Sequence, residues 1–283
     1  MVSAGRLSVV STPIGHLGDF SFRGLEVLRE AALIAAEDTR RTRRLLAHYG
    51  VEAAVVSIRA HSRPEALERL LDRVAAGEDV AYVTDAGTPG VSDPGAALVE
   101  AALRRGLCVV PVPGASAVMA ALAAAGFPAD RFVFVGFLPR KGASRAALLE
   151  RVGREAWTLV CFEAPGRTAP LLEDLAASCG ADRPAAVARE LTKLHEEVRR
   201  GTLGELAAYY GGRRVRGEVT VVVAGLGREA AAPAGADPRD GAVDAATLIA
   251  SLRTEGRPPS AIAKELARRL GISRQSAYRL LDT

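Results

Sequence analysis

The sequence predicts an α/β fold of two domains followed by a small helical module. Along residues 1–227, short apolar runs alternate with amphipathic stretches of helical period, which is typical of α/β proteins. A Pro/Gly-rich stretch at 111–115 separates two sets of expected strands. A stretch of small residues then precedes a basic segment with helical spacing. We therefore expect domains at 1–113 and 114–227, a linker at 228–242 and a module at 243–283.

The expected strands are short runs rich in Val, Leu and Phe. They lie at 7–10, 53–57, 80–84, 108–112, 132–136, 158–162, 185–188 and 219–224. The run at 80–82 is continuously apolar, which indicates a strand covered on both faces. We interpret Cys108 and Cys161 as thiols in strand cores, because the three cysteines of the chain lack disulfide or zinc spacing.

The expected helices show apolar residues three and four positions apart. They lie at 21–32, 39–49, 64–76, 95–105, 115–125, 144–152, 168–179 and 203–210. Asp38 and Asp93 stand near predicted helix starts, and we interpret both as caps. Asp93 also precedes Pro94, a residue that suits the first turn of a helix.

The module at 243–283 has the pattern of a helix-turn-helix. A first helix is expected at 244–252, a second begins after its cap Ser260, and a third at 274–281 follows a turn at Gly271. Basic residues along the second helix are compatible with contact to a nucleic acid. A small packing or oligomerising module fits the same pattern, and both interpretations stay open at this point.

Charge is unevenly distributed along the chain. The formal net charge is +4, and residues 251–283 hold seven basic and three acidic residues, so the preceding 250 residues are neutral overall. Basic clusters at 40–44, 140–145 and 199–216 either meet a polyanion or form solvated faces. Because no apolar run approaches the roughly 18–20 residues of a membrane span and no signal peptide precedes the first strand, we expect a cytoplasmic protein.

Two loops rich in Gly and Pro predict a small-molecule site. They lie within 82–95 and 111–127, each directly after an apolar run, where α/β proteins form ligand clefts. Neither has a P-loop or dinucleotide signature. The chain also lacks a G-x-S-x-G elbow, an H-E-x-x-H motif and any carboxylate cluster, so we expect neither acyl transfer nor a metal.

Six motifs in register identify a family resemblance. They are S-T-P-I-G-x-L-x-D, A-E-D-T-R-x-T-x-x-L-L, T-D-A-G-T-P-x-x-S-D-P-G, P-x-P-G-x-S-A, G-F-L-P-R-K and A-R-E-L-T-K-x-x-E-E, spread from Ser11 to Glu197. Together they resemble the tetrapyrrole methylase superfamily and, within it, the ribosomal RNA small subunit methyltransferase I family. The resemblance implies two α/β domains with a cofactor cleft between them and a homodimer.

The resemblance also implies the reaction, which is methyl transfer from S-adenosylmethionine to the ribose 2′-hydroxyl of a cytidine in the decoding region of 16S ribosomal RNA. The substrate is then small-subunit RNA or the assembled 30S particle. The implied cofactor-binding positions are Pro13, Asp85, Gly87, Thr88, Pro89, Val91, Ser116, Ala117, Phe162, Ala188 and Thr220.

A ribose hydroxyl is poorly acidic, so a general base or a nearby cation would help its methylation. The candidates for this role are Glu163, Glu190 and Lys193, although Glu190 could instead form an ion pair with Arg189. The candidates for contact with RNA are Arg40, Arg43, Arg140 and Lys141.

Two other functions compete with this interpretation. One is a methylase of a corrinoid or porphyrin precursor, which is the substrate class of the wider superfamily. The other is a metabolite-sensing regulator whose C-terminal module binds a nucleic acid.

Overall fold

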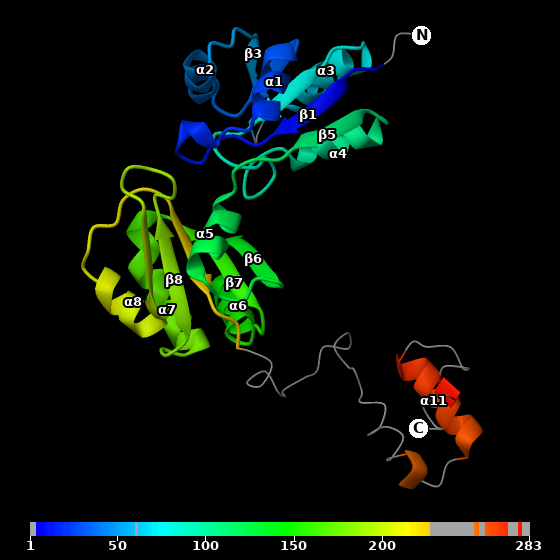
Figure 1. Ribbon diagram of the computed structural model, residues 1–283, viewed down its shortest axis with the longest axis vertical. Coiled ribbons are helices and arrows are strands. Elements are labelled where there is room, and N and C mark those ends of the chain that lie inside the picture. Colours follow the sequence, from blue (N-terminus) through cyan, green and yellow to red (C-terminus); the bar gives the residue numbers. More distant parts are fainter. Residues whose placement is uncertain (1–3, 60–61, 227–251, 255–257, 271–276, 279–283) are drawn as a thin grey trace. The chain divides into compact units, whose positions relative to one another are not determined.

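The computed structural model describes residues 4–59, 62–226, 252–254, 258–270 and 277–278. The chain divides into two compact units, Met1–Ala231 and Ala232–Thr283. The first unit contains two five-stranded sheets with helices packed on them, as Figure 1 shows. The predicted α/β class with two sheets is therefore confirmed. No helix among the described residues is long and apolar enough to span a membrane.

The first sheet is entirely parallel and has the strand order β3-β2-β4-β1-β5. Its strands are β1 (Arg6–Val10), β2 (Leu33–Ala36), β3 (Val55–Ser57), β4 (Val80–Val83) and β5 (Cys108–Val112). All residues of β2 and β4 are buried, because helices cover both faces of the sheet. This burial explains why β4 is a continuous apolar run in the sequence.

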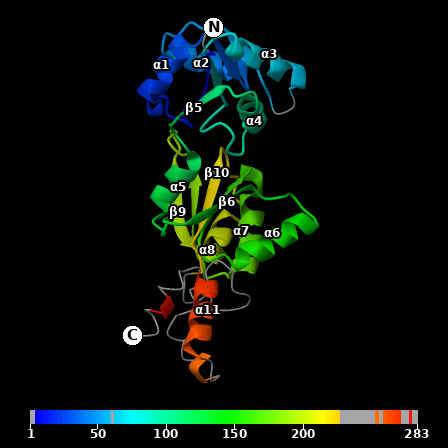
Figure 2. The same cartoon turned by 90° about the vertical axis from the view of Figure 1, so that its right-hand side faces the viewer.

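Two pairs of helices cover the first sheet, as Figure 2 shows. They are α1 (Phe22–Glu30) and α2 (Thr39–His48) on one face, and α3 (Pro64–Ala75) and α4 (Ala96–Arg104) on the other. Asp38 caps α2, as expected, because its side chain accepts a hydrogen bond from the Arg40 N–H at 2.8 Å. Asp93 does not cap α4, since Gly95 occupies the N-cap position and no side chain bonds there.

The second sheet is mixed and has the order β6-β7-β10-β8-β9. Its strands are β6 (Phe132–Phe137), β7 (Thr158–Glu163), β8 (Pro184–Arg189), β9 (Glu197–Thr202) and β10 (Val219–Val223). Strand β10 runs antiparallel to both of its neighbours, β7 and β8. The beginning of β10 therefore lies at the same edge of the sheet as the ends of β7 and β8.

Helices also cover both faces of the second sheet. Helix α5 (Ala117–Ala125) packs on one face, and α6 (Ala143–Gly153), α7 (Thr168–Cys179) and α8 (Leu203–Tyr210) lie on the other. A capping box between Thr202 and Glu205 begins α8. The apolar faces of these helices and of the sheet form the two cores of this part of the unit.

The eight expected strands and eight expected helices of residues 1–227 are present, with ends shifted by at most two residues. Two strands were not predicted. Strand β2 has the sequence LIAA, which continues the helical pattern before it, and β9 is a charged edge strand of sequence EVRRGT. The interpretation of Cys108 as a core thiol was wrong, because β5 is an edge strand and Cys108 is exposed. Cys161 is buried, as expected.

In the second unit, the structure describes a helical turn at 252–254, helix α11 (Pro259–Leu270) and residues 277–278. Ile262, Ala263 and Leu266 on α11 are buried. Helix α11 begins at Pro259, so Ser260 lies inside its first turn and does not cap it as predicted. The predicted linker at 228–242 and the Gly271 turn lie outside the described residues, as does most of the first and third predicted helices.

Replacing Leu175 on α7 with Ala should lower the free energy of unfolding by about 2–5 kcal/mol. Leu175 is fully buried in the core beneath the second sheet, so truncation leaves a cavity. Leu194 is 93% exposed, and the matched change Leu194→Ala should alter stability by less than about 0.5 kcal/mol. Urea unfolding of both variants measures the difference, and equal midpoints would contradict the assigned core.

Candidate functional site

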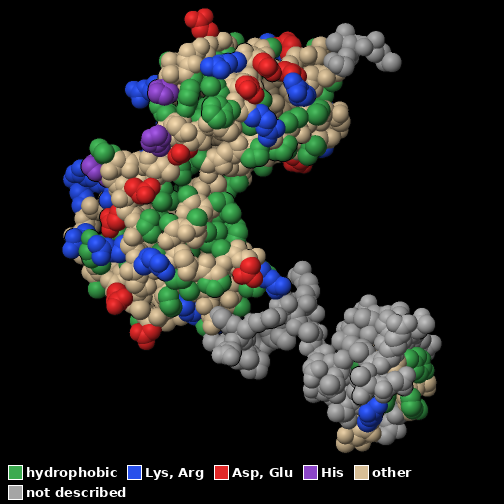
Figure 3. Space-filling view, in the orientation of Figure 1, with side chains coloured by type: hydrophobic (Ala, Val, Ile, Leu, Met, Phe, Trp, Pro, Cys, Tyr) green, Lys and Arg blue, Asp and Glu red, His purple; other side chains and the backbone are tan. Residues whose placement is uncertain are grey.

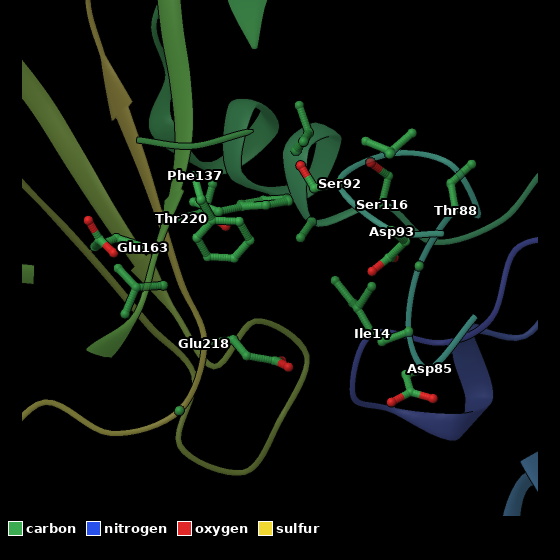
Figure 4. Close-up of a pocket in the computed structure, with 18 of the residues that line it drawn as sticks. Ile14, Asp85, Thr88, Ser92, Asp93, Ser116, Phe137, Glu163, Glu218 and Thr220 are labelled. Atoms are coloured by element: carbon green, nitrogen blue, oxygen red, sulfur yellow. The ribbon is translucent and has the colours of Figure 1, made fainter. Parts of the chain in front are cut away.

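A cavity of about 460 Å³ lies between the loops of the two sheets. Figure 4 shows its lining side chains, and Figure 3 shows the hollow in this face of the first unit. The first sheet contributes Ile14, Glu37, the 85–93 loop and residues 116–118. The second sheet contributes the end of β6, the end of β7 with the residues after it, and the beginning of β10. A cavity of this size accommodates a cofactor-sized ligand.

The cavity lies here because strand direction gathers these loops. In the parallel first sheet, the carboxyl ends of β1, β2, β4 and β5 share one edge, and each is followed by a lining loop. In the second sheet, β7 ends where the antiparallel β10 begins, so residues after one and before the other face the same space. Residues that are distant in the sequence thus meet at one site.

The loop after β4 has an unusual backbone that fixes its side chains. Gly87, Gly90, Ser92 and Gly95 all have positive φ angles, of 80°, 85°, 60° and 135°. At Gly95 a Cβ atom would also lie 2.7 Å from the ring of Tyr82, so this position requires glycine. A positive φ at the serine is uncommon and persists only where the surroundings determine it.

Backbone hydrogen bonds join this loop to the loop after β1. The Thr12 N–H donates to the Gly87 carbonyl at 2.9 Å, and the Gly87 N–H donates to the Thr12 carbonyl at 3.0 Å. The Ser11 hydroxyl also lies 3.1 Å from that of Thr88. Because both loops are fixed to each other, Ile14 and Asp85 keep their places at the cavity.

Most of the expected cofactor-binding residues line this one cavity. They are Asp85, Gly87, Thr88, Val91, Ser116, Ala117, Phe162 and Thr220. Pro13 lines an adjoining hollow of about 260 Å³, which shares Ile14, Arg41 and Asp85 with the cavity. Pro89 and Ala188 lie in neither lining, and Ala188 is buried in the core beside α5.

Among the three expected catalytic residues, Glu163 lines the cavity. It is 2% exposed. Its Oε1 accepts hydrogen bonds from the Ala164 N–H, at 2.7 Å, and from the Arg167 guanidinium. Its Oε2 is buried and has no hydrogen-bond partner in the described part of the chain. A buried carboxylate oxygen with no partner at a cavity wall is a candidate acceptor for a ligand.

Glu190 and Lys193 neutralise each other beside the cavity. The Lys193 ammonium lies 2.8 Å from Glu190 and 2.7 Å from Glu218. Burial by itself lowers the pKa of Lys193, but the two carboxylates outweigh it and raise that pKa. The hydrogen bond from Lys193 lowers the pKa of Glu190. The alternative of an ion pair between Glu190 and Arg189 is not realised, because Glu190 pairs with Lys193 and Arg189 lies 3.1 Å from Glu197.

The cavity is strongly acidic. Glu37, Asp85, Asp93, Glu163 and Glu218 contribute carboxylates, and among the described residues that line the cavity Arg41 is the one that is basic. Arg41 lies 3.5 Å from Asp85, Arg167 binds Glu163, and Lys193 binds Glu218. Among the ion pairs of the described residues, Glu37 and Asp93 have no cation.

The pKa values reflect this crowding. Burial raises the pKa of Asp93 to about 6, and the neighbouring carboxylates of Glu37, Asp85 and Glu218 raise it in the same direction. Burial also raises the pKa of Glu37, with a further contribution from Asp85. Asp93, which the sequence predicted to be a helix cap, is thus a titratable carboxyl group in the cavity wall.

Several lining residues were missed by the sequence interpretation. Gly217 and Glu218 precede β10, and only the antiparallel direction of that strand brings them to the cavity. Arg41 lies within the A-E-D-T-R-x-T motif, but the sequence interpretation named only its neighbour Arg40, as a candidate for contact with RNA. Arg40 instead forms an ion pair with Asp38 at 2.9 Å.

The expected RNA-contacting residues lie on two exposed surfaces. Arg40 and Arg43 belong to α2, whereas Arg140 and Lys141 precede α6. None of these four residues lines the cavity. Among the described residues, no group of His, Cys, Asp and Glu side chains could hold a metal ion.

The α/β fold, with two β-sheets and a cavity between their loops, matches a known class of protein. The family profile of tetrapyrrole (corrin/porphyrin) methylases matches residues 6–207, so the chain belongs to this family. The crystal structure of uroporphyrin-III C-methyltransferase from Thermus thermophilus, complexed with S-adenosylhomocysteine, has the same fold. It aligns with a TM-score of 0.56 and 23% identity, covering 78% of this chain and 97% of that one.

Curated relatives narrow the family further. A protein of Xylella fastidiosa, named ribosomal RNA small subunit methyltransferase I, is 43% identical over 98% of this chain and 99% of its own length. A Pseudomonas aeruginosa protein of the same name is 49% identical over 79% of this chain and 80% of its own length. Within the tetrapyrrole methylases, the chain belongs to the ribosomal RNA small subunit methyltransferase I family.

Replacing Lys193 with Met should destabilise the protein at neutral pH and much less in acid. The change leaves Glu190 and Glu218 without their shared cation, at an expected loss of roughly 1–2 kcal/mol. The stabilisation from the lowered pKa of Glu190 exists above the ordinary carboxyl pKa and disappears as Glu190 becomes protonated.

Urea unfolding of the wild type and the variant, at about pH 7.5 and about pH 3.5, measures this difference. Lys193→Arg is the matched control, because it keeps the charge and should preserve most of the stability. An equal loss at both pH values would contradict the ion-pair interpretation.

Proposed function

We propose that this protein transfers a methyl group from S-adenosylmethionine to the ribose 2′-hydroxyl of a cytidine in the decoding region of 16S ribosomal RNA. Membership of the ribosomal RNA small subunit methyltransferase I family supports this activity and substrate. The S-adenosylhomocysteine in the Thermus thermophilus relative supports the cofactor. The relatives with the higher identities carry the RNA methyltransferase name, which favours RNA over a porphyrin or corrinoid substrate.

The observation that carries the proposal is an acidic cavity that has small residues in its wall. Glu37 and Asp93 have no cation among the described ion pairs, so the cavity favours a positively charged ligand. Gly87, Ser116 and Ala117 leave room for close approach of an adenosine or methionine group. The unpartnered Oε2 of Glu163 offers an acceptor to a ligand hydroxyl or amine.

S-adenosylmethionine, when bound, supplies an activated methyl group on a sulfonium. The residues of the chain then have three tasks, which are to orient the donor, to exclude water and to accept the proton of the ribose hydroxyl. We assign the first two tasks to the expected cofactor residues that line the cavity, with Phe162 and Val91 as its apolar walls.

We assign the third task, proton acceptance, to Asp93. Its carboxylate lies in the cavity wall, as Figure 4 shows, and its pKa of about 6 is near the pH at which a general base works best. Lys193 is held in its protonated form by two carboxylates, so we give it and Glu190 a positioning role. Glu163 remains a candidate for binding the substrate or the cofactor.

We also propose the remaining features that follow from the family. They are a homodimer, action on ribosomal RNA or on the assembled 30S particle, and a cytoplasmic location. We keep the division into domains at 1–113 and 114–227, a linker at 228–242 and a helix-turn-helix-like module at 243–283 as part of this proposal. The basic net charge of the last segment is compatible with contact to RNA.

Replacing Glu37 with Gln should weaken the binding of S-adenosylmethionine more than the binding of S-adenosylhomocysteine. Both ligands carry the same amino acid and adenosine groups, but the first alone has the sulfonium charge. Losing one carboxylate near that charge corresponds to about 1 kcal/mol, or about fivefold in Kd. Isothermal calorimetry with each ligand measures the two changes, and Glu52→Gln, an exposed change outside the cavity, is the matched control.

The activity itself is tested with tritium-labelled S-adenosylmethionine. Transfer is measured to naked 16S RNA and to small subunits from cells that lack the enzyme, and the modified ribose is then mapped. Well-folded protein that binds neither ligand and transfers no label to either substrate would overturn the proposed function. Equal weakening of both ligands by Glu37→Gln would instead contradict only the sulfonium site.

Replacing Asp93 with Asn should lower the rate of methyl transfer by roughly 100-fold or more without lowering the melting temperature. Asp93 accepts a proton only when it is ionised, so the wild-type rate should rise with pH through about 6 and then level off. The raised pKa means that ionised Asp93 destabilises the folded state at neutral pH, and Asn removes this charge.

Single-turnover rates from about pH 5 to about pH 8, with thermal melts of both proteins, check these expectations. Asp19→Asn is a matched control on an exposed residue outside the cavity. A variant that keeps the wild-type rate and pH profile would remove Asp93 from the mechanism.

A further inference from the structure

Four arginines form an exposed strip on the second sheet and its adjoining loop. Arg199 lies on the edge strand β9, and Arg213, Arg214 and Arg216 lie between α8 and β10. We propose that this arginine strip binds the phosphodiester backbone of the RNA and guides the strand to the cavity. The proposal rests on the proposed function, since it names the surface that holds that RNA.

The strip has an unbalanced positive charge. Within the part of the chain that the structure describes, Arg199 has one carboxylate partner, Glu197, which it shares with Arg189. Arg213, Arg214 and Arg216 form no ion pair there, and all three are exposed. Figure 3 shows basic side chains gathered on the left side of the part of the first unit that contains the second sheet. Guanidinium groups in such numbers suit the closely spaced phosphates of RNA.

An aromatic ring holds two of the arginines in place. The guanidinium carbon of Arg199 lies 3.6 Å from the centre of the Tyr209 ring, and that of Arg213 lies 4.1 Å from it. Arg199 Nε also donates a hydrogen bond to Glu197 Oε1 at 3.3 Å. Because cation–π contacts compensate part of the repulsion between like charges, the two groups stay close together before any anion binds. Preorganised donors lose less freedom on binding.

The strip is continuous with the cavity. Arg216 is followed directly by Gly217 and Glu218, which line the cavity, and then by β10. In Figure 1 this yellow segment runs along the edge of the sheet, from α8 to the end where β10 begins. At Gly217 the backbone has a φ of 85°, and the Glu190 side chain occupies the place of a Cβ, so the end of the segment is fixed. A strand held on the strip therefore ends at the mouth of the cavity.

Several other arginines of the first unit are paired with carboxylates, whereas Arg213, Arg214 and Arg216 have no ion pair among the described residues. Arg40 is neutralised by Asp38, and exposed arginines such as Arg104 and Arg154 lie in ion pairs along their own helices. Arg104 and Arg154 provide controls, because they carry the same charge without the geometry of the strip. Arg151, which is exposed on α6, completes a control set of three.

The test compares two triple variants of the full chain. One is Arg213→Gln with Arg214→Gln and Arg216→Gln, and the other is Arg104→Gln with Arg151→Gln and Arg154→Gln. Binding of in vitro transcribed 16S RNA is measured by filter retention over a range of salt concentrations. For the strip variant we expect at least a tenfold loss of affinity at about 0.1 M salt, and a salt slope smaller by about 2. The control variant should change affinity less than threefold.

Four further measurements separate the proposal from its alternatives. Calorimetry with S-adenosylhomocysteine should give the wild-type Kd for both triple variants, and their melting temperatures should match the wild type. The KM for RNA should rise in the strip variant while kcat at saturating RNA stays near the wild-type value. Replacing the same three arginines with Lys should restore most of the salt slope, because the slope counts charges.

Wild-type affinity and salt slope in the strip variant would overturn the proposal, even if methyl transfer persists. Equal losses in the two triple variants would also overturn it, because net charge alone would then explain binding. If the wild-type chain binds no methyl donor but the strip variant still binds RNA more weakly than the wild type, the proposed function is wrong and the arginine strip is still an RNA-binding surface.

Discussion

The site depends on the reciprocal backbone hydrogen bonds between Thr12 and Gly87. They join the loops after β1 and β4 at the carboxyl edge of a parallel sheet, where no strand pairing remains to fix the chain. With these loops held together, Asp85 keeps its place in the cavity wall, and the positive-φ turns after it bring Ser92 and Asp93 to the same wall. The backbone therefore determines the position of the polar groups, and the side chains determine the charge of the cavity.

In the first unit, an acidic cavity lies next to a basic surface segment. Carboxylates dominate the cavity, whereas arginines dominate the exposed segment that leads to it. In the proposed reaction the donor is a cation and the acceptor is a polyanion, so each partner meets a surface of the opposite charge. Burial is the main cause of the raised pKa of Asp93, and its acidic neighbours Glu37, Asp85 and Glu218 raise that pKa further.

Local sequence pattern predicted the secondary structure well where periodicity was clear. Helices such as α7 and α8, with apolar residues on one face, matched their expected bounds. Strands β2 and β9 were missed for different physical reasons. The former is a short buried strand of Leu, Ile and Ala that continues a helical pattern, and the latter is a charged edge strand stabilised by one neighbour. Edge position also explains the exposure of Cys108, which pattern alone cannot reveal.

The sequence by itself determined the α/β class, most of the elements, the family and nine residues of the cavity wall, because these depend on local periodicity and on motifs of adjacent residues. Only the tertiary structure decided which polar residues meet. It brought Glu37, Asp93 and Glu218 together, paired Lys193 with two carboxylates, and joined the arginine strip to the cavity. The physical reason is that strand direction and order, above all the antiparallel β10, arise from long-range pairing that no local pattern encodes.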